Sequence, residues 1–571
     1  MKKLITLCAA VLLFGAAQAK DTAPTKAVKI YYKSVYNGKV SDKPQAEITS
    51  IGNEVVVRGQ KPAQEQIAEV PQEATYIDYN AKRVLKVANL YTGEQIYTSR
   101  SFDALPKFEQ TNETEKILGF TCKKYKASIF SNSIEVFVAD NTNLKGSPSP
   151  SLYVDGLVLK VVRNGNITFV ADKLEYLTKK NTPTSLLPAS LGTEVTDTKY
   201  SAKVAGSFVK TVTVFDNEQI CFTNDIKNPE NQNLSDQTYR YAGGTLIIRK
   251  VKLPKVPADA NVFAEITQRS NGDAYDRTGS IFIIPQDKKQ SFLEGIQKGI
   301  NTIPVYTDKH GIKFQGVVAT DDYSPIIELV RFFTPFGVGH FNTFRQVEGL
   351  NWKDSAQYKQ DITELLPKLE NEVWVGAFIG NYDKGGHKLS LRLKYHLNSM
   401  GKQPESTKKV WMCPLFATIN VMEMGGQQYG RMFDNDTLRV RFNAPKGVKN
   451  VSLRYITTGH GGWENGDEFV KKQNEIFLNG SRIYSFTPWR TDCATYRPYN
   501  PASGNFWNGI SSSDLSRSGW CPGTLTNPVY IPVGDLKEGA NEISVYIPLG
   551  PTEGGSQSSW NISGILIGEM E

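Results

Sequence analysis

Two short segments of the chain place carboxylates beside glycines and an arginine. In NGDAYDRTGSIFIIP, the residues Asp273, Asp276 and Arg277 lie in a Gly- and Asn-rich turn before an apolar, strand-like run. In GHGGWENGDEF, Glu468 lies in a glycine-rich loop. An ionised carboxylate can orient a water molecule and accept its proton, so Asp276 is a candidate general base and Glu468 is a second candidate site residue. Taken alone, Asp276 is more typical of a turn or an ion pair, because Asp bonds its own backbone and tolerates bends, and Glu468 is more typical of an exposed loop.

The histidines and cysteines do not form a metal-binding pattern. There is no HExxH and no C-x-x-C, and the five histidines are scattered along the chain. Structural and catalytic zinc sites need three or four such ligands at short, characteristic spacings. We therefore expect no metal and no other cofactor.

The first 19 residues predict export. MKKLITLCAAVLLFGAAQA combines two lysines, an apolar stretch and a small-x-small end, which is the order of a cleaved secretory signal. We expect a secreted or periplasmic bacterial protein that begins at Lys20. No later stretch approaches the roughly 20 apolar residues of a membrane helix, so the sequence predicts no membrane span.

Composition limits the class of partner. The formal net charge of +8 is small for 571 residues, and no polybasic run occurs. Nucleic acid is therefore not an expected partner. With 40% hydrophobic and 11% aromatic residues the chain can form large cores, and its length indicates three or four domains at roughly 150 residues each.

Strand patterns dominate the chain. Runs such as TLIIRKV (245–251) are rich in β-branched residues, and EIFLNGSRIY predicts a hairpin that turns at Asn479 and Gly480. Helical periodicity is sparse; SFLEGIQKGI (291–300) and SAQYKQDITELLPKLE (355–370) are the better candidates. Many short strands with turn-rich connections predict β-sandwiches or jelly rolls.

Three blocks follow the signal. The first, residues 20–195, ends in the polar, proline-bearing NTPTSLLPASLGTEVTDT. The second covers residues 205–398, and the third covers residues 409–571 after the polar connector SMGKQPESTKK. Boundaries between segments are the least accurate part of a prediction from sequence.

The first block resembles the GLPGLI family of secreted Bacteroidetes proteins. The resemblance rests on ILGFTCKKYKA (117–127) and SLYVDGLVLKVV (151–162). It implies an accessory β domain without assigned chemistry. Because the block contains no histidine, we interpret Cys122 as a small buried residue rather than a nucleophile.

The second and third blocks resemble the peptide-N-glycosidase F (PNGase F) family. RYITTGHGGWENGDEFVKKQNEIFLNG, RTDCATYRPYNP and SDLSRSGWCPG are similar to its C-terminal jelly roll, and SRSGWCPG is the most specific match. NGDAYDRTGSIFIIP, followed by VRFFTPFGVG, is similar to its N-terminal jelly roll. The resemblance covers about residues 205–571. It implies an all-β fold of two antiparallel jelly-roll domains side by side, preceded by a β-rich N-terminal domain.

The resemblance also implies roles for particular residues. Asp276 takes the place of the principal catalytic acid and Glu468 that of a second catalytic acid. Arg277 is expected to favour the charged form of Asp276 or to bind substrate oxygens. Trp520 offers a flat face for a sugar ring, or else covers a disulfide. The substrate-binding set implied is Arg277, Arg517, Trp520, His460 and Tyr275, with His460 alternatively capping its loop, and Cys493 and Cys521 are the implied disulfide pair.

The sequence departs from the family pattern at several positions. Phe378 stands near the place of a third acid, with Asp383 as a possible substitute. Gly466 and Val470 stand where the family has a tight disulfide, and Thr458 replaces a cleft tryptophan. These changes predict a pocket of altered shape.

As a whole, the resemblance implies a secreted amidase that cleaves the bond between an asparagine side chain and the first N-acetylglucosamine. The products are aspartate and a free glycan, and the partners are N-linked glycoproteins and glycopeptides. We expect a monomer. The alternatives are a non-catalytic carbohydrate-binding or adhesion protein, or a glycoside hydrolase that uses Asp276 and Glu468 as its carboxylate pair.

Overall fold

The computed structural model describes residues 27–59, 72–90, 92–178, 182–225, 227–397, 409–434, 436–461, 465–503, 511–552 and 555–570. The chain divides into two compact units, Met1–Phe208 and Val209–Glu571. The predicted signal peptide, residues 1–19, and nearly all of the predicted connector before residue 409 lie outside the described residues. In the described ranges, no helix has the length and apolar character needed to cross a membrane.

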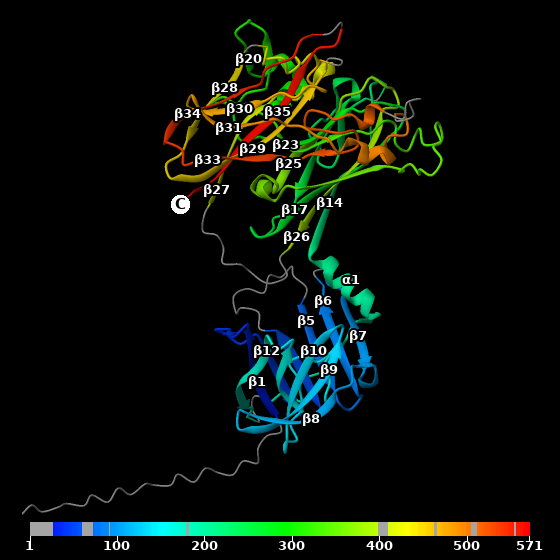
Figure 1. Cartoon of the computed structure of the whole chain (residues 1–571), viewed down its shortest axis with the longest axis vertical. Coiled ribbons are helices and arrows are strands. Elements are labelled where there is room, and N and C mark those ends of the chain that lie inside the picture. Colours follow the sequence, from blue (N-terminus) through cyan, green and yellow to red (C-terminus); the bar gives the residue numbers. More distant parts are fainter. Residues whose placement is uncertain are drawn as a thin grey trace, which may run out of the picture. The chain divides into compact units, whose positions relative to one another are not determined.

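The first unit (Figure 1, blue to cyan) is one large sheet with a helix. On its strand β1, Val28, Ile30 and Tyr32 alternate with more exposed residues, so one face of the strand is buried. The helix α1 (Asp197–Ser207) begins after Thr196, whose side chain accepts the N–H of Lys199 as an N-cap. In sheet order the strands are β13 (Thr193–Glu194), β7 (Gln95–Ser101), β6 (Arg83–Asn89), β5 (Gln72–Asp78), β4 (Glu54–Gly59), β3 (Ala46–Ile51), β1 (Ala27–Tyr36), β12 (Ile167–Tyr176), β11 (Leu157–Arg163), β10 (Asn132–Ala139), β9 (Phe120–Ile129) and β8 (Glu109–Ile117), with β2 (Lys39–Val40) paired to β1.

The second unit (Figure 1, green to red) begins with a jelly roll of two antiparallel sheets. The smaller sheet has the order β14 (Val209–Ile220), β26 (His387–His396), β17 (Asn261–Ser270) and β24 (Ala356–Asp361). The larger has the order β15 (Thr238–Tyr241), β16 (Leu246–Leu253), β25 (Asn371–Ile379), β18 (Thr278–Ile284), β23 (Ile327–Phe333) and β32 (Leu525–Thr526). The strand β23 is buried along its whole length. The helix α2 (Phe292–Lys298) places its Phe292 and Ile296 in the core that also holds Phe282 and Ile284 of β18.

The second jelly roll follows in the same unit. One sheet has the order β27 (Lys409–Ala417), β35 (Ser559–Met570), β29 (Val448–His460) and β33 (Val529–Gly534). The other has the order β28 (Thr437–Ala444), β34 (Gly539–Tyr546), β30 (Asn474–Leu478) and β31 (Ser481–Phe486). Two short pairs complete the unit: β19 (Gln290–Ser291) with β22 (Tyr323–Ser324), and β20 (Val305–Thr307) with β21 (Lys313–Gln315). The all-β, jelly-roll architecture is therefore confirmed.

Buried charges join the two jelly rolls. Arg454 of β29 donates hydrogen bonds to the main-chain oxygens of Glu328 and Leu329 at 2.9 and 3.0 Å. Arg331 of β23 donates to the main-chain oxygen of Asn561 at 2.6 Å and forms a fully buried ion pair with Glu328 at 2.7 Å. Because a buried charge is tolerated only with such partners, these contacts fix how the two sheets meet. The short strand β32 crosses from the second jelly roll to pair with β23.

Two local predictions have different outcomes. The hairpin at Asn479 and Gly480 is confirmed: both residues have positive φ, 50° and 82°, and they join β30 to β31. The helix predicted at 355–370 is wrong. Its first part is the strand β24 and its second part is a 3-10 turn, Thr363–Lys368.

Candidate active site

Each jelly roll contributes one of the two candidate acids. Asp276 lies in the loop between β17 and β18, and Glu468 lies in the loop between β29 and β30. The guanidinium of Arg517 joins them: Nε donates to Glu468 Oε1 at 3.0 Å, and a terminal nitrogen donates to Asp276 Oδ2 at 3.1 Å. The side chain of Arg517 is 2% exposed, whereas those of Asp276 and Glu468 are 15% and 19% exposed. The two acids therefore share one buried cation and keep access to solvent.

Burial controls the charge of both acids. It raises the pKa of Asp276, the positive charge of Arg517 opposes this, and the negative charge of Glu468 raises the pKa of Asp276 further. Burial likewise raises the pKa of Glu468, against the opposing effect of Arg517. Perturbed carboxyl groups that face each other across a shared cation are typical of acid–base sites, because their protonation can change near neutral pH.

Arg517 is held by main-chain oxygens and by aromatic rings. Another terminal nitrogen of its guanidinium donates to the main-chain oxygens of Ser512 and Leu515 at 2.6 and 3.3 Å. Its guanidinium carbon lies 4.8 Å from the Trp520 ring centroid and 5.0 Å from that of Phe469. Such contacts lock the planar guanidinium and thereby fix where the two carboxylates meet.

The role expected for Trp520 is corrected by its burial. Trp520 is 3% exposed, and its ring stacks on Phe333 with centroids 4.1 Å apart. Its indole N–H donates to the main-chain oxygen of Gly459 at 3.0 Å. With Phe333 and Arg517 against the ring, no flat face remains for a sugar. Trp520 instead supports Arg517.

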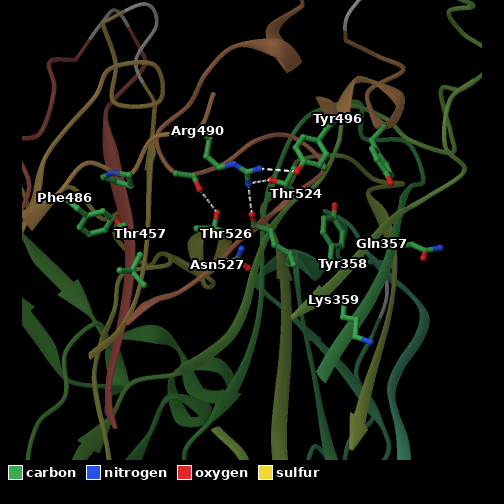
Figure 2. A pocket seen from close by; sticks show the side chains of 16 residues that line it. Gln357, Tyr358, Lys359, Thr457, Phe486, Arg490, Tyr496, Thr524, Thr526 and Asn527 are labelled. Atoms are coloured by element: carbon green, nitrogen blue, oxygen red, sulfur yellow. Dashed lines mark hydrogen bonds between the residues drawn. The ribbon is translucent and has the colours of Figure 1, made fainter. Parts of the chain in front are cut away.

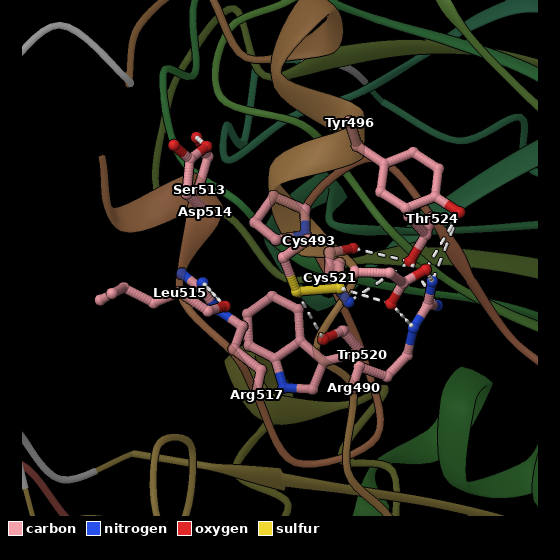
Figure 3. Close-up of a disulfide and its surroundings, with 12 residues drawn as sticks. Arg490, Cys493, Tyr496, Ser513, Asp514, Leu515, Arg517, Trp520, Cys521 and Thr524 are labelled. Carbon is pink, nitrogen blue, oxygen red and sulfur yellow. Dashed lines mark hydrogen bonds and ion pairs between the residues drawn. A yellow bond between two sulfur atoms is a disulfide. The ribbon is translucent and has the colours of Figure 1, made fainter. Parts of the chain in front are cut away.

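The disulfide between Cys493 and Cys521 is confirmed and lies beside this loop (Figure 3). The Cα atoms of the pair are 5.1 Å apart, and the bridge closes a separation of 28 residues. Arg517 lies within the bridged segment, and it exchanges main-chain hydrogen bonds at 2.8 and 3.1 Å with Arg490, which lies just before that segment. Cys122 and Cys221 are free and buried, and Cys413 is free and half-buried.

The Asp–Arg pair around Asp276 has a structural explanation. Arg277 Nε donates to Asp273 Oδ2 at 2.7 Å, and the main-chain N–H of Tyr275 donates to Asp273 Oδ1 at 3.1 Å. Asp273 is also 3.3 Å from His387 Nε2, and both residues are buried. Burial raises the pKa of Asp273, but the hydrogen bonds from His387 and Arg277 outweigh this and lower its pKa to about 2. Asp273 is thus the anchor of the turn that presents Asp276.

Arg277 and Tyr275 form part of an exposed rim. The guanidinium carbon of Arg277 lies 5.0 Å from the ring centroid of Tyr275 and 5.5 Å from that of Tyr382. Tyr275 is 61% exposed and Tyr382 is 56% exposed. Tyr275 and Arg277, which were expected to bind substrate, therefore remain accessible to a ligand. Tyr382 lies beside them.

Comparison with known proteins decides the family. Residues 211–395 and 428–567 match the models "Peptide-N-glycosidase F, N terminal" and "Peptide-N-glycosidase F, C terminal", and residues 30–200 match "N-glycanase peptide, N-terminal domain". A solved structure of PNGF-II is 43% identical, covers 95% of this chain and 99% of its own, and superimposes with a TM-score of 0.78. The chain belongs to the PNGase F family.

Two further structures complete the comparison. A second crystal form of PNGF-II is 43% identical over 95% of this chain and 98% of that one, with a TM-score of 0.74. PNGase F, a glycosylasparaginase from Flavobacterium meningosepticum, is 13% identical over 63% of this chain and 96% of that one, with a TM-score of 0.41. No curated protein matches the chain.

Within this PNGase F-family chain, the His460 ring lies against Phe333 and Trp520, with centroids 5.6 Å apart in each pair. Burial lowers the pKa of His460 to about 3, and the charges of Arg331 and Arg517 act in the same direction. Its Nε2 is 2.7 Å from the hydroxyl of Thr458, to which Arg331 donates at 3.0 Å. Thr458 thus links a neutral His460 to the buried charges between the jelly rolls.

The two residues expected near the third acid, Phe378 and Asp383, have structural roles. Phe378 is 2% exposed in the core, and Asp383 Oδ1 accepts the N–H groups of Gly385 and Gly386 at 2.8 and 2.7 Å, so Asp383 closes a turn. Glu423, in contrast, lies beside Gly380, where an added Cβ would be 3.8 Å from its Oε2.

Glu423 belongs to the exposed rim. Its Oε1 accepts hydrogen bonds from the hydroxyls of Tyr382, at 2.5 Å, and Tyr429. We did not predict this residue from sequence, because Glu423 carries no motif and lies 147 positions after Asp276. The Gly-rich EMGGQQYG around it was the only signal.

Proposed function

We propose that this protein is a peptide-N-glycosidase. It hydrolyses the amide between an asparagine side chain and N-acetylglucosamine, which yields aspartate and the released glycan. The observation that supports this best is the pair Asp276 and Glu468, one from each jelly roll, bound to the single buried guanidinium of Arg517 in a chain of the PNGase F family.

In this proposal Asp276 acts as the base. Its ionised carboxylate orients a water molecule toward the carbonyl carbon of the asparagine side chain and accepts a proton as the new C–O bond forms, an effect typically worth about 10²–10⁴-fold. The C–N bond then breaks, and the nitrogen leaves with the sugar as a glycosylamine. Arg517 favours the ionised form of Asp276 that this step needs.

Glu468 has the complementary role. Burial raises its pKa, so it retains a proton at higher pH than an exposed glutamate. A carboxyl group of this kind can protonate the departing nitrogen or hold a sugar hydroxyl. The rim formed by Tyr275, Arg277 and Tyr382 faces solvent beside Asp276 and is the proposed substrate-binding surface.

The proposal includes the substrates, location and oligomeric state of the enzyme. It acts on N-linked glycoproteins and glycopeptides as a secreted or periplasmic monomer after removal of residues 1–19.

Mass analysis of the products of one glycopeptide tests this function. A peptide that carries Asp in place of Asn, together with an intact glycan, is the expected result. A peptide whose Asn retains one sugar would identify a glycoside hydrolase that uses the same carboxylates. An unchanged glycopeptide would identify a non-catalytic carbohydrate-binding protein.

A further inference from the structure

A cavity lies where the two jelly rolls meet. It has a volume of about 500 Å³. Neither Asp276 nor Glu468 lines it, and we refer to it as the seam pocket. Its walls come from both jelly rolls and include Gln357, Tyr358, Phe486 and Asn527 (Figure 2). Tyr499 also lines it.

Four strand edges converge on the seam pocket. Lining residues belong to β24, β31, β32 and β33, and each of these is the last strand of its sheet in the described part of the chain. An edge strand presents main-chain N–H and C=O groups along one side, which is a template for pairing with another extended chain.

The side chains of the pocket fit a polypeptide better than a sugar. Stacking of a pyranose ring needs an exposed flat face, but Tyr358 is 4% exposed and its hydroxyl donates to the main-chain oxygen of Phe333 at 2.8 Å. Tyr499 and Phe486 are half-buried and form the apolar wall, while Gln357 and Asn527 are exposed at the rim. Apolar walls, amide groups and strand edges together match alternating side chains on an extended backbone.

The pocket and the candidate active site share one loop. Gly519 and Gly523 line the pocket, and between them lie Trp520 and Cys521, while Arg517 just before them binds both acids. Arg490 holds the segment after Gly523 in place. It donates hydrogen bonds to the hydroxyl of Thr524 at 3.1 Å and to the main-chain oxygen of Leu525 at 3.0 Å (Figure 2). A chain that fills the pocket therefore lies against the loop that carries Arg517.

We propose that the seam pocket binds an extended segment of polypeptide, namely the peptide part of the glycoprotein substrate. This rests on the proposed peptide-N-glycosidase function. The peptide pairs with the edge strands that line the pocket, its side chains pack on Tyr499 and Phe486, and it thereby anchors the glycosylated asparagine near Asp276.

Two glycopeptides with the same N-glycan test the proposal. One carries a single residue on each side of the asparagine, and the other about ten residues on each side, which spans roughly 30 Å per arm when extended. Asn527→Trp fills the rim of the pocket. Asn301→Trp is the matched control, because Asn301 is exposed and does not line the pocket.

Asn527→Trp should raise KM for the long glycopeptide by at least about fivefold, close to 1 kcal/mol of binding, and leave KM for the short one unchanged. Equal effects on both lengths, or no effect on the long one, would overturn the proposal. So would a KM change that follows glycan size instead of peptide length, since this marks a sugar site. If Asn527→Trp lowers the melting temperature more than the control does, Gln357→Trp, at the opposite rim, replaces it under the same criteria.

A binding measurement separates this proposal from the proposed function. The long peptide without its glycan, labelled with fluorescein, should bind the wild-type chain in an anisotropy titration and bind Asn527→Trp at least about fivefold more weakly. Binding without any glycan release would contradict the peptide-N-glycosidase function and leave the pocket assigned to a polypeptide. Glycan release without any peptide binding would support the peptide-N-glycosidase function and overturn the assignment of the pocket to a polypeptide.

Discussion

Arg517 determines how the two candidate catalytic acids are charged. A single buried guanidinium bonded to two carboxylates must stabilise whichever of them is ionised, while burial favours the protonated form of each. An exposed ion pair would have little effect, because water screens it. Here the side chain of Arg517 is 2% exposed, so the site gains a carboxylate that can be ionised yet is still basic enough to accept a proton.

The two arginines near Asp276 should differ in their effect on the pH profile. Arg517→Met removes the cation bonded to Asp276, so the pKa of Asp276 rises and the acid limb of kcat/KM moves upward by at least about one pH unit. Arg277→Met should move the limb in the same direction by less, since Arg277 is bonded to Asp273. The pH dependence of kcat/KM for both variants measures this. A larger shift in Arg277→Met would contradict the assignment.

Asp273 should contribute to stability in a pH-dependent way. Its pKa of about 2 in the folded chain is lower than that of an unfolded aspartate, about 3.9, which corresponds to about 2–3 kcal/mol above pH 4. This stabilisation is present above the unfolded pKa and is lost as the pH falls through 2. Urea unfolding of Asp273→Asn at pH 5 and pH 3 should therefore show a destabilisation that shrinks with acid. Asp216→Asn, at a side chain 72% exposed, is the control and should show no such trend.

At the scale of single residues, the sequence predicted the identity of the two candidate acids but not their contacts. Asp276 and Glu468 were recognisable from the motifs around them, and the Asp273–Arg277 pair was visible as neighbours in one turn. Arg517 could not be assigned as their bridge, because 241 residues separate it from Asp276. Nor could the stacking of Trp520, which follows from the packing of Phe333 against it.

At the level of elements, the strands that carry the site were the most predictable part. Alternation and β-branched runs are local properties, so β16 appears where the run TLIIRKV indicates it, and β30 and β31 form the predicted hairpin. The segment 355–370 was misread as a helix. Its first half, AQYKQD, alternates between buried and exposed residues as the edge strand β24, and pairing with β17 decides its conformation.

The disulfide should stabilise the loop that carries Arg517. Loop-closure entropy for a bridge across 28 residues is about 3–4 kcal/mol. Replacing both Cys493 and Cys521 with Ser should lower the free energy of unfolding by about 3 kcal/mol. Denaturant unfolding measures this, with Cys413→Ser, a half-buried free cysteine, as the control. A loss no larger than that of the control would contradict the structural role of the bridge.

At the scale of the whole molecule, the chain consists of two units with separate cores. The candidate site and the seam pocket both lie within Val209–Glu571, and the sheet of the first unit, with α1, ends before it. The domain limits predicted from sequence, 20–195, 205–398 and 409–571, remain predictions. Composition marks where linkers occur but does not reveal that β32 crosses between the two jelly rolls.

Residues 209–571 should be active without the first unit. This shortened chain retains Asp276, Glu468, Arg517 and the disulfide, so it should fold and release glycan within about threefold of the full-length rate, a difference below 1 kcal/mol. Circular dichroism confirms its folding and a glycan-release assay its activity. A folded but inactive fragment would mean that the first unit takes part in the reaction.

The most direct test of the account is glycan release from a denatured glycoprotein by folded, purified Asp276→Asn. Asn keeps the shape of the side chain and is tolerated in a turn, but it cannot accept the proton of water, so release should fall by at least about 10²-fold. Glu468→Gln should lower release by less if Glu468 mainly holds the sugar. Near-normal release by Asp276→Asn would show that Asp276 is an ordinary turn residue and would contradict the proposed mechanism.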